Sequence, residues 1–257
     1  MALYVPRPPV LQAGTHDCYL KFVSASEIRL MPYGGDQILV NGTRHTIPAA
    51  GVALASNPGW AGYQCLYVRA VADPVLRIDA ADPAAGTAIN SDGMLTCGGW
   101  PVVGLFSQNG GSVFQNQFNI CGVISYYNRR KRVVWQSSST SGGQTASQHL
   151  GNFGCACMAF AGDHLRLDVS GYQTNTTAGI STITSLKAGL FPSMTGVVNT
   201  NAVDAISYHH VANWAQNVGL HGGYTVPAAG SYVLMIYAHV NGGGASWFLN
   251  TGISFEG

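Results

Sequence analysis

The chain has 257 residues, of which 47% are hydrophobic and only 9% are charged, and its formal net charge is +1. Soluble domains are typically about 25% charged, so a surface this poor in charge is expected to be covered by neighbouring subunits or, alternatively, built from small polar groups. The near-zero net charge excludes a strongly basic field for nucleic acid. No apolar stretch approaches the roughly 18 residues that span a bilayer, and the N-terminus lacks a signal-peptide core. We therefore expect a protein that starts in a cytoplasm and enters no membrane.

Residues 1–17 are expected to form an extended arm. The segment Pro6-Arg-Pro-Pro9 holds three prolines, which cannot join a helix interior or a central strand. Such an arm is either disordered or docked on a partner.

From residue 18 onward, short runs of β-branched and aromatic residues alternate with Gly-, Pro- and Asn-rich turns, while helical periodicity is nearly absent. The segment His164–Val169 alternates polar and apolar residues, as a half-buried strand does. Strands are expected at residues 38–40, 65–72, 102–106, 120–127, 164–169 and 232–240. Many short strands separated by turns predict an all-β fold of sandwiches or barrels.

The segment 137–148, SSSTSGGQTASQ, contains no large apolar residue and is expected to be a flexible linker or long loop. It divides the chain into a β-sandwich at 18–136 and a jelly-roll-like β-sandwich at 149–257. The sequence Thr46-Ile-Pro-Ala-Ala-Gly51 is echoed by Thr225-Val-Pro-Ala-Ala-Gly230. The echo indicates either a duplicated domain or repeated turn chemistry on unrelated sheets.

Six cysteines lie at positions 18, 65, 97, 121, 155 and 157. Their wide spacing favours buried thiols over a disulfide framework, although oxidation after release from a cell stays open. Cys155 and Cys157 are two apart, so on a strand they face the same side. This spacing is neither the C-x-x-C redox motif nor half of a zinc ribbon.

No catalytic motif is present: the sequence has no nucleophile elbow, no H-E-x-x-H and no phosphate-binding glycine loop. Asp79 and Asp82 are close together, but they suit a polar turn before Pro83 better than the paired acids of a glycosidase. We expect a protein that is not an enzyme and has no cofactor and no metal site.

Two segments are candidates for interaction. The run at 128–132 is the only dense charge cluster, and pairing with carboxylates of a neighbouring subunit or a structural role is favoured over nucleic-acid binding. The second segment contains the adjacent histidines His209 and His210. On a loop these two side chains could form a metal or sugar site, whereas on a strand one would be buried and the other exposed. The candidate residues are Asn128, Arg129, Arg130, Lys131, Arg132, Tyr208, His209, His210 and Trp214.

Residues 30–135 carry, in order, Ile38-Leu-Val-Asn-Gly42, Thr46-Ile-Pro-Ala-Ala-Gly51, Val103-Gly-Leu105 and Ile124-Ser-Tyr-Tyr-Asn-Arg-Arg130. This order resembles a family of bacteriophage virion proteins, often called tail-fibre-like or capsid-decoration-like, that close on an aromatic-Asn-Arg-Arg motif. The segment from Tyr224 to Val240, followed by a Gly-rich turn and Trp247-Phe-Leu, is similar to jelly rolls of the tumour-necrosis-factor and complement-head type, which assemble as trimers.

The resemblance implies a non-catalytic structural protein of a phage virion. It would be a homotrimeric surface appendage, a capsid decoration, head fibre or tail-associated fibre, that stabilises the particle, contacts capsid or tail subunits and binds host surface glycans. Trp60, Trp100, Trp214 and Trp247 are candidates for glycan contacts, with core packing as the favoured alternative. A receptor-binding tail fibre or tail-tip protein is the second hypothesis, and a small polysaccharide hydrolase is the third.

Overall fold

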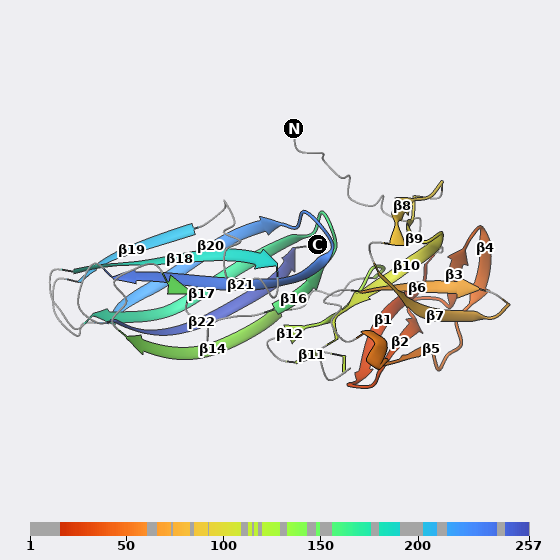
Figure 1. The fold of residues 1–257 in the computed structure, drawn as a ribbon, viewed down its shortest axis with the longest axis horizontal. Helices are drawn as coiled ribbons and strands as arrows, with labels where there is room; N and C mark the ends of the chain where they lie inside the picture. The colour runs from red at the N-terminus through yellow and green to blue at the C-terminus, as the bar shows by residue number, and fades with distance from the viewer. Residues whose placement is uncertain are drawn as a thin grey trace.

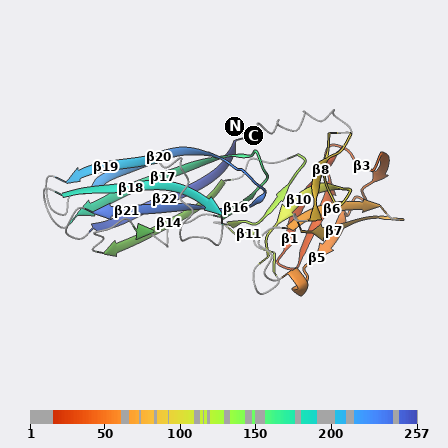
Figure 2. The same ribbon diagram turned by 45° about the horizontal axis from the view of Figure 1, so that its top comes forward.

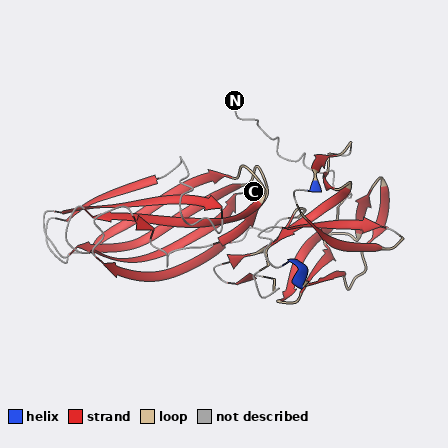
Figure 3. Ribbon diagram, viewed as in Figure 1, coloured by secondary structure: helices blue, strands red, loops and turns tan. Residues whose placement is uncertain are grey.

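The computed structural model describes most of the chain between residues 16 and 256. The described residues are 16–60, 66–72, 74–82, 85–91, 93–108, 113–114, 116–117, 120–128, 133–142, 148–149, 156–175, 180–190, 203–209, 215–240 and 245–256. The all-β prediction is confirmed, because these residues form strands joined by turns, and helix is confined to short 3-10 pieces such as η1 at Pro58–Trp60 (Figure 3). The predicted N-terminal arm lies outside the described residues, except for its last two, His16 and Asp17.

The described residues of the N-terminal region form strands β1 to β13, most of them in small sheets (Figure 1). One sheet has the order β1-β2-β5, and another has β7-β6-β10-β9-β8 with β13 pairing β10. A separate hairpin joins β3 and β4. The strands are β1 Cys18–Ser24, β2 Glu27–Pro32, β3 Gln37–Val40, β4 Thr43–Thr46, β5 Val52–Ala55, β6 Leu66–Ala72, β7 Leu76–Ala81, β8 Thr87–Ile89, β9 Leu95–Cys97, β10 Trp100–Phe106, β11 Asn116–Gln117, β12 Ile120–Cys121 and β13 Val123–Ser125.

The C-terminal region is a jelly roll of eight principal strands. One sheet has the order β14-β22-β17-β20, and the facing sheet contains β16-β21-β18-β19, with β12 and β11 added beside β16 and β15 beside β21. Two four-stranded sheets with this interleaved order are the double Greek key of a jelly roll. The strands are β14 Val133–Gly142, β15 Gln148–His149, β16 Ala156–Ala159, β17 His164–Asn175, β18 Ile180–Leu190, β19 Val203–His209, β20 Gln216–Thr225, β21 Gly230–Val240 and β22 Ala245–Glu256.

Strands β6 and β10 are buried on both faces, which explains their nearly continuous apolar sequences. Along β10, Val103 and Phe106 enter a core with β1, β2 and β3, whereas Val102 and Leu105 enter a second core. Along β6, Val68 joins the first core and Tyr67 the second. The sheet that contains β6 and β10 therefore separates two hydrophobic cores.

The second core also belongs to the jelly roll. It combines Tyr67 and Leu105 of the N-terminal region with Met158, Leu165 and Tyr232 of the jelly roll. Strand β12 runs parallel to β16 at the same junction. Figures 1 and 2 show the two groups of strands arranged end to end, with β11 and β16 where they meet. The two regions thus share apolar side chains and a strand pairing, while the predicted domain boundaries stay a prediction.

The linker predicted for residues 137–148 is wrong for Ser137–Gly142, which continue β14 and pair with β22 from Asn250 back to Ala245. A strand at the edge of a sheet is held by backbone hydrogen bonds to its one neighbouring strand. It can therefore form without large apolar side chains. Residues 143–147 lie outside the described part. The repeated hexapeptide lies in two regions with different strand orders, so it reflects similar turns rather than two copies of one fold.

Candidate functional site

The predicted interaction residue Asn128 serves an internal contact. Its side-chain amide donates hydrogen bonds to the backbone carbonyls of His16 at 3.0 Å and Cys18 at 2.9 Å. The backbone of Asn128 is left-handed, with a φ of 49°, a conformation that Asn adopts more readily than most residues. The ring of His16 stacks on Tyr127 with ring centroids 4.2 Å apart. The closing aromatic-Asn motif thus fixes the chain where the arm meets β1.

The remaining predicted residues are not assembled into a site by the described part of the chain. Tyr208 and His209 end β19, in register with Ser181 and Ile180 of β18. Arg129, Arg130, Lys131, Arg132, His210 and Trp214 lie outside the described residues. Of the tryptophans, Trp100 packs against the core of the N-terminal region, as the core-packing alternative expects.

The turn predicted around Asp79 is replaced by a strand. Asp79 lies in β7 and forms a two-pronged ion pair with Arg69 of β6, at 2.9 and 2.8 Å. Arg69 also donates to the carbonyl of Cys97 at 3.2 Å. Hydrogen bonding to Asp79 raises the pKa of Arg69 above its ordinary value. Through Arg69, this ion pair connects β7 and β6 to β9.

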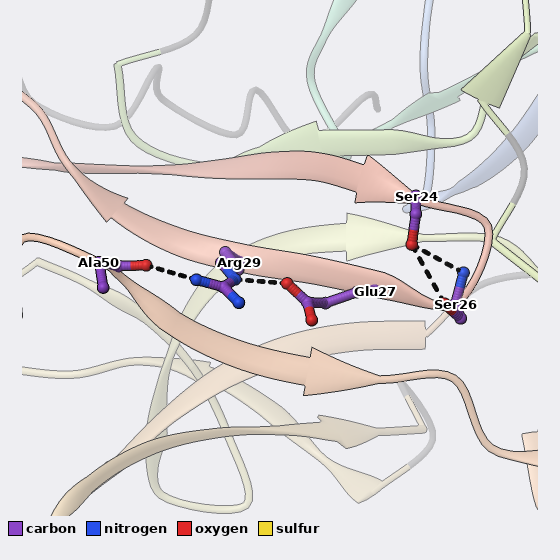
Figure 4. A network of polar contacts seen from close by, with 5 residues as sticks. All are labelled: Ser24, Ser26, Glu27, Arg29 and Ala50. Atoms are coloured by element: carbon purple, nitrogen blue, oxygen red, sulfur yellow. Dashed lines mark hydrogen bonds and ion pairs between the residues drawn. The ribbon is translucent and has the colours of Figure 1, made fainter.

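A polar network at the β1–β2 end of the N-terminal region is also structural (Figure 4). Ser24 and Ser26 bond to each other across the turn, at 3.1 Å between hydroxyl oxygens. Arg29 pairs with Glu27 on the same strand and donates to the carbonyl of Ala50 at 2.8 Å. Because Ala50 belongs to the repeated hexapeptide, this contact holds that turn against β2.

The outer face of the β14-β22-β17-β20 sheet carries the main polar cluster that the sequence did not predict. On β17, Leu165, Leu167 and Val169 are buried, and the alternate residues face outward. Asp168 accepts a hydrogen bond from Nδ1 of His221 on β20 at 2.6 Å and contacts Nε of Arg166 at 3.2 Å. His221 and Arg166 remain more than half exposed. Their alternation was visible in the sequence, but the pairing of Asp168 with His221 depends on the register of β17 and β20.

Two glycines of β20, Gly219 and Gly223, lie on this outer face. A Cβ placed on Gly219 would meet no atom within 4 Å, whereas one on Gly223 would lie 2.5 Å from Nε2 of His164. The ring of His164 therefore covers Gly223, and the surface above Gly219 is open. Tyr172, two residues beyond Ser170 on the same strand face, is 40% exposed. The outward-facing residues of β17 and β20 are mostly polar, and the charges of Arg166 and Asp168 offset each other.

The described residues include no group of three or more His, Cys, Asp or Glu side chains that could hold a metal ion. They also include no helix long and apolar enough to cross a membrane.

No model of a protein family matches the chain, and no curated protein sequence is significantly similar to it. Solved structures with a similar arrangement include a VP2 subviral particle of infectious bursal disease virus, at 12% identity and a TM-score of 0.37, covering 93% of this chain and 70% of that one. The Gx strain of the same virus gives 11% identity and a TM-score of 0.35, covering 93% of this chain and 65% of that one.

The insecticidal delta-endotoxin Cry8Ea1 from Bacillus thuringiensis also matches, at 9% identity and a TM-score of 0.33, covering 93% of this chain and 52% of that one. This chain thus spans between about half and about 70% of the proteins it resembles.

Proposed function

We propose that this chain is a non-catalytic structural protein of a bacteriophage virion. It acts as a homotrimeric surface appendage, a capsid decoration, head fibre or tail-associated fibre, that stabilises the particle through contacts with capsid or tail subunits. The observation that carries the proposal is the outward-facing residues of β17 and β20, many of which are exposed in a single chain although only 9% of all residues are charged. A protein with so little charge depends on covered surfaces for solubility.

A second copy of the chain suits this face. The cluster of Arg166, Asp168 and His221 neutralises its own charges, so covering it leaves no isolated ion. The open surface over Gly219 allows a neighbouring chain to approach the backbone closely. The trimeric assembly of the jelly rolls that the C-terminal sequence resembles supports three copies.

The assembly is tested by light scattering of the full chain. A trimer has a mass of about 81 kDa, three times the 27.0 kDa of one chain, and a 27.0 kDa species at micromolar concentration contradicts the proposal. The variant Gly219→Arg tests the face itself. Gly219 has room for a side chain and lies outside the positive-φ glycines, so the chain should fold but fail to form trimers.

The matched control is Val75→Arg, at a position that is 72% exposed in the N-terminal region. It adds the same charge away from the proposed face and should remain a trimer. If Gly219→Arg stays a trimer with an unchanged circular-dichroism spectrum, the trimer uses another face.

The virion role is tested on purified particles. The protein should co-purify with them, and a low-resolution image labelled at this chain should place it on the capsid or the tail. Hundreds of copies per particle indicate a decoration protein, and a few copies indicate the alternative, a receptor-binding tail protein. Binding of host glycans stays a prediction from the sequence resemblance.

A further inference from the structure

Two cysteines face each other where the N-terminal region meets the jelly roll. Cys121 of β12 and Cys157 of β16 are register partners in the parallel pairing of these strands. Both are buried, at 0% and 1% exposure, and both belong to the same core. Both are thiols in this structure.

The geometry of a parallel pair brings such residues within bonding reach. Neighbouring strands lie about 4.7–4.9 Å apart, and register partners direct their side chains to the same side of the sheet. Disulfides join residues whose Cα atoms are about 4.4–6.8 Å apart. Register partners at this regular strand spacing, such as Cys121 and Cys157, are expected to fall inside that range without a change in strand register.

The other described thiols are placed differently. Cys18 lies in the core of the N-terminal region. Cys97 pairs with Trp100 and Thr87 in the β8-β9-β10 part of the sheet, and its thiol contacts the carbonyl of Asp82 at 3.5 Å. Strand pairing therefore selects Cys121 and Cys157 among the described cysteines.

We propose that Cys121 and Cys157 form a redox-sensitive pair that closes to a disulfide under oxidising conditions. The bond would join β12 of the N-terminal region to β16 of the jelly roll and enclose residues 121–157, which include the edge strand β14. Under reducing conditions the two thiols pack as small apolar side chains.

Glutathione disulfide supplies the oxidising equivalents by thiol–disulfide exchange. One cysteine thiolate attacks a sulfur of glutathione disulfide, forming a mixed disulfide and releasing one glutathione thiolate. The second cysteine thiolate attacks the protein sulfur of the mixed disulfide and releases the second glutathione thiolate. Two protein thiols are oxidised, one glutathione disulfide is reduced, and the two thiol protons pass to the glutathione produced. Because both thiols are buried, the reaction requires local opening of the short β12–β16 pairing and should be slow.

The test uses the full chain, purified with a reducing agent and then exposed to glutathione disulfide. Trypsin cuts the denatured product at Arg129–Arg132 and so separates Cys121 from Cys157. Mass spectrometry without reduction should find the two peptides linked and two hydrogen atoms lighter. Fragmentation then distinguishes Cys121 from Cys97 and Cys157 from Cys155. The oxidised protein should melt about 5–10 °C above the reduced one.

Matched variants separate this bond from general oxidation. Cys97→Ser should still form the bond and show the increase in melting temperature, whereas Cys121→Ser and Cys157→Ser should lose both. If a core variant fails to fold, the peptide map of the wild-type protein decides alone. A bond from Cys121 or Cys157 to another cysteine, a persistent glutathione adduct or full retention of both thiols overturns the proposal. None of these outcomes bears on the trimer or the virion role.

Discussion

The ring of Phe160 from the jelly roll stacks on the ring of Tyr67 from the N-terminal region, with ring centroids 6.3 Å apart and planes inclined by 16°. Tyr126 meets Phe160 edge-on at 4.9 Å. Phe160 is 2% exposed and lies in the core that both regions share. Aromatic contacts of this kind add to the apolar area that each ring buries, so the two regions are expected to unfold together.

Replacing Phe160 with Ala should lower the free energy of unfolding of the whole chain by about 3–5 kcal/mol, because it removes a buried ring and leaves a cavity. Urea unfolding followed by tryptophan fluorescence and by circular dichroism should give coincident transitions, both shifted. Val75→Ala, at an exposed position, is the control and should change stability by less than about 0.5 kcal/mol. Two separate transitions, only one of them moved by Phe160→Ala, would show that the regions are independent domains.

Asn128 should contribute to stability through its two bonds to the start of β1. Removing a side chain that satisfies partly buried carbonyls costs about 1–3 kcal/mol. Asn128→Ala is expected to cost more than Asn128→Gly, because Ala tolerates the left-handed backbone poorly and Gly tolerates it well. Chemical denaturation of both variants separates the hydrogen bonds from the backbone effect. A glycine variant as stable as the wild type would mean that the bonds to His16 and Cys18 contribute nothing measurable.

Much of the fold followed from local pattern. The alternation in His164–Val169 predicted the buried Leu165, Leu167 and Val169, and apolar runs marked β6, β10 and β21. The prediction of a linker at Ser137–Gly142 was wrong. The lack of large apolar residues shows only that the segment places no such side chain in a core. It does not indicate whether a neighbour supplies backbone partners, and here β22 supplies them.

The contacts between distant segments could not be predicted in the same way. Three such contacts depend on strand register or strand order. They are the pairing of Asp168 with His221, the hydrogen bond from Asn128 to His16 and the adjacency of Cys121 and Cys157. Several registers are compatible with one pattern of alternation. The shared core was missed because β6 and β10 alternate between two apolar surroundings, so their sequences indicate burial without saying which elements cover them.

Stability should fall at alkaline pH, partly through Cys18. The thiol is fully buried, and burial, with a smaller effect of the Asp17 carboxylate, raises its pKa from 9.0 to about 12. The unfolded chain loses this proton near pH 9 and the folded chain keeps it to about pH 12. Between these values the folded state binds more protons, so the free energy of unfolding decreases as pH rises, by up to about 1.4 kcal/mol per pH unit for this group.

The measurement is urea unfolding in reducing agent at several values between pH 8 and about pH 10.5, on the wild type and on Cys18→Ala. The variant should show a shallower decrease with pH. Burial, with a smaller effect of Cys18, also raises the pKa of Tyr127, so the difference between the slopes reports Cys18 together with its coupling to Tyr127. Equal slopes would mean that the Cys18 thiol ionises alike in the folded and unfolded chains.

Deleting residues 2–14 should leave the melting temperature nearly unchanged while reducing incorporation into particles. The deletion ends before His16, so the hydrogen bonds from Asn128 and the stacking on Tyr127 are retained. A proline-rich arm that binds a capsid or tail subunit contributes contact area to that partner rather than to its own fold. Melting curves and the copy number in purified particles measure the two effects separately. A lower melting temperature would make the arm part of the fold, and a normal copy number in particles would rule out that the arm attaches the protein to a capsid or tail subunit.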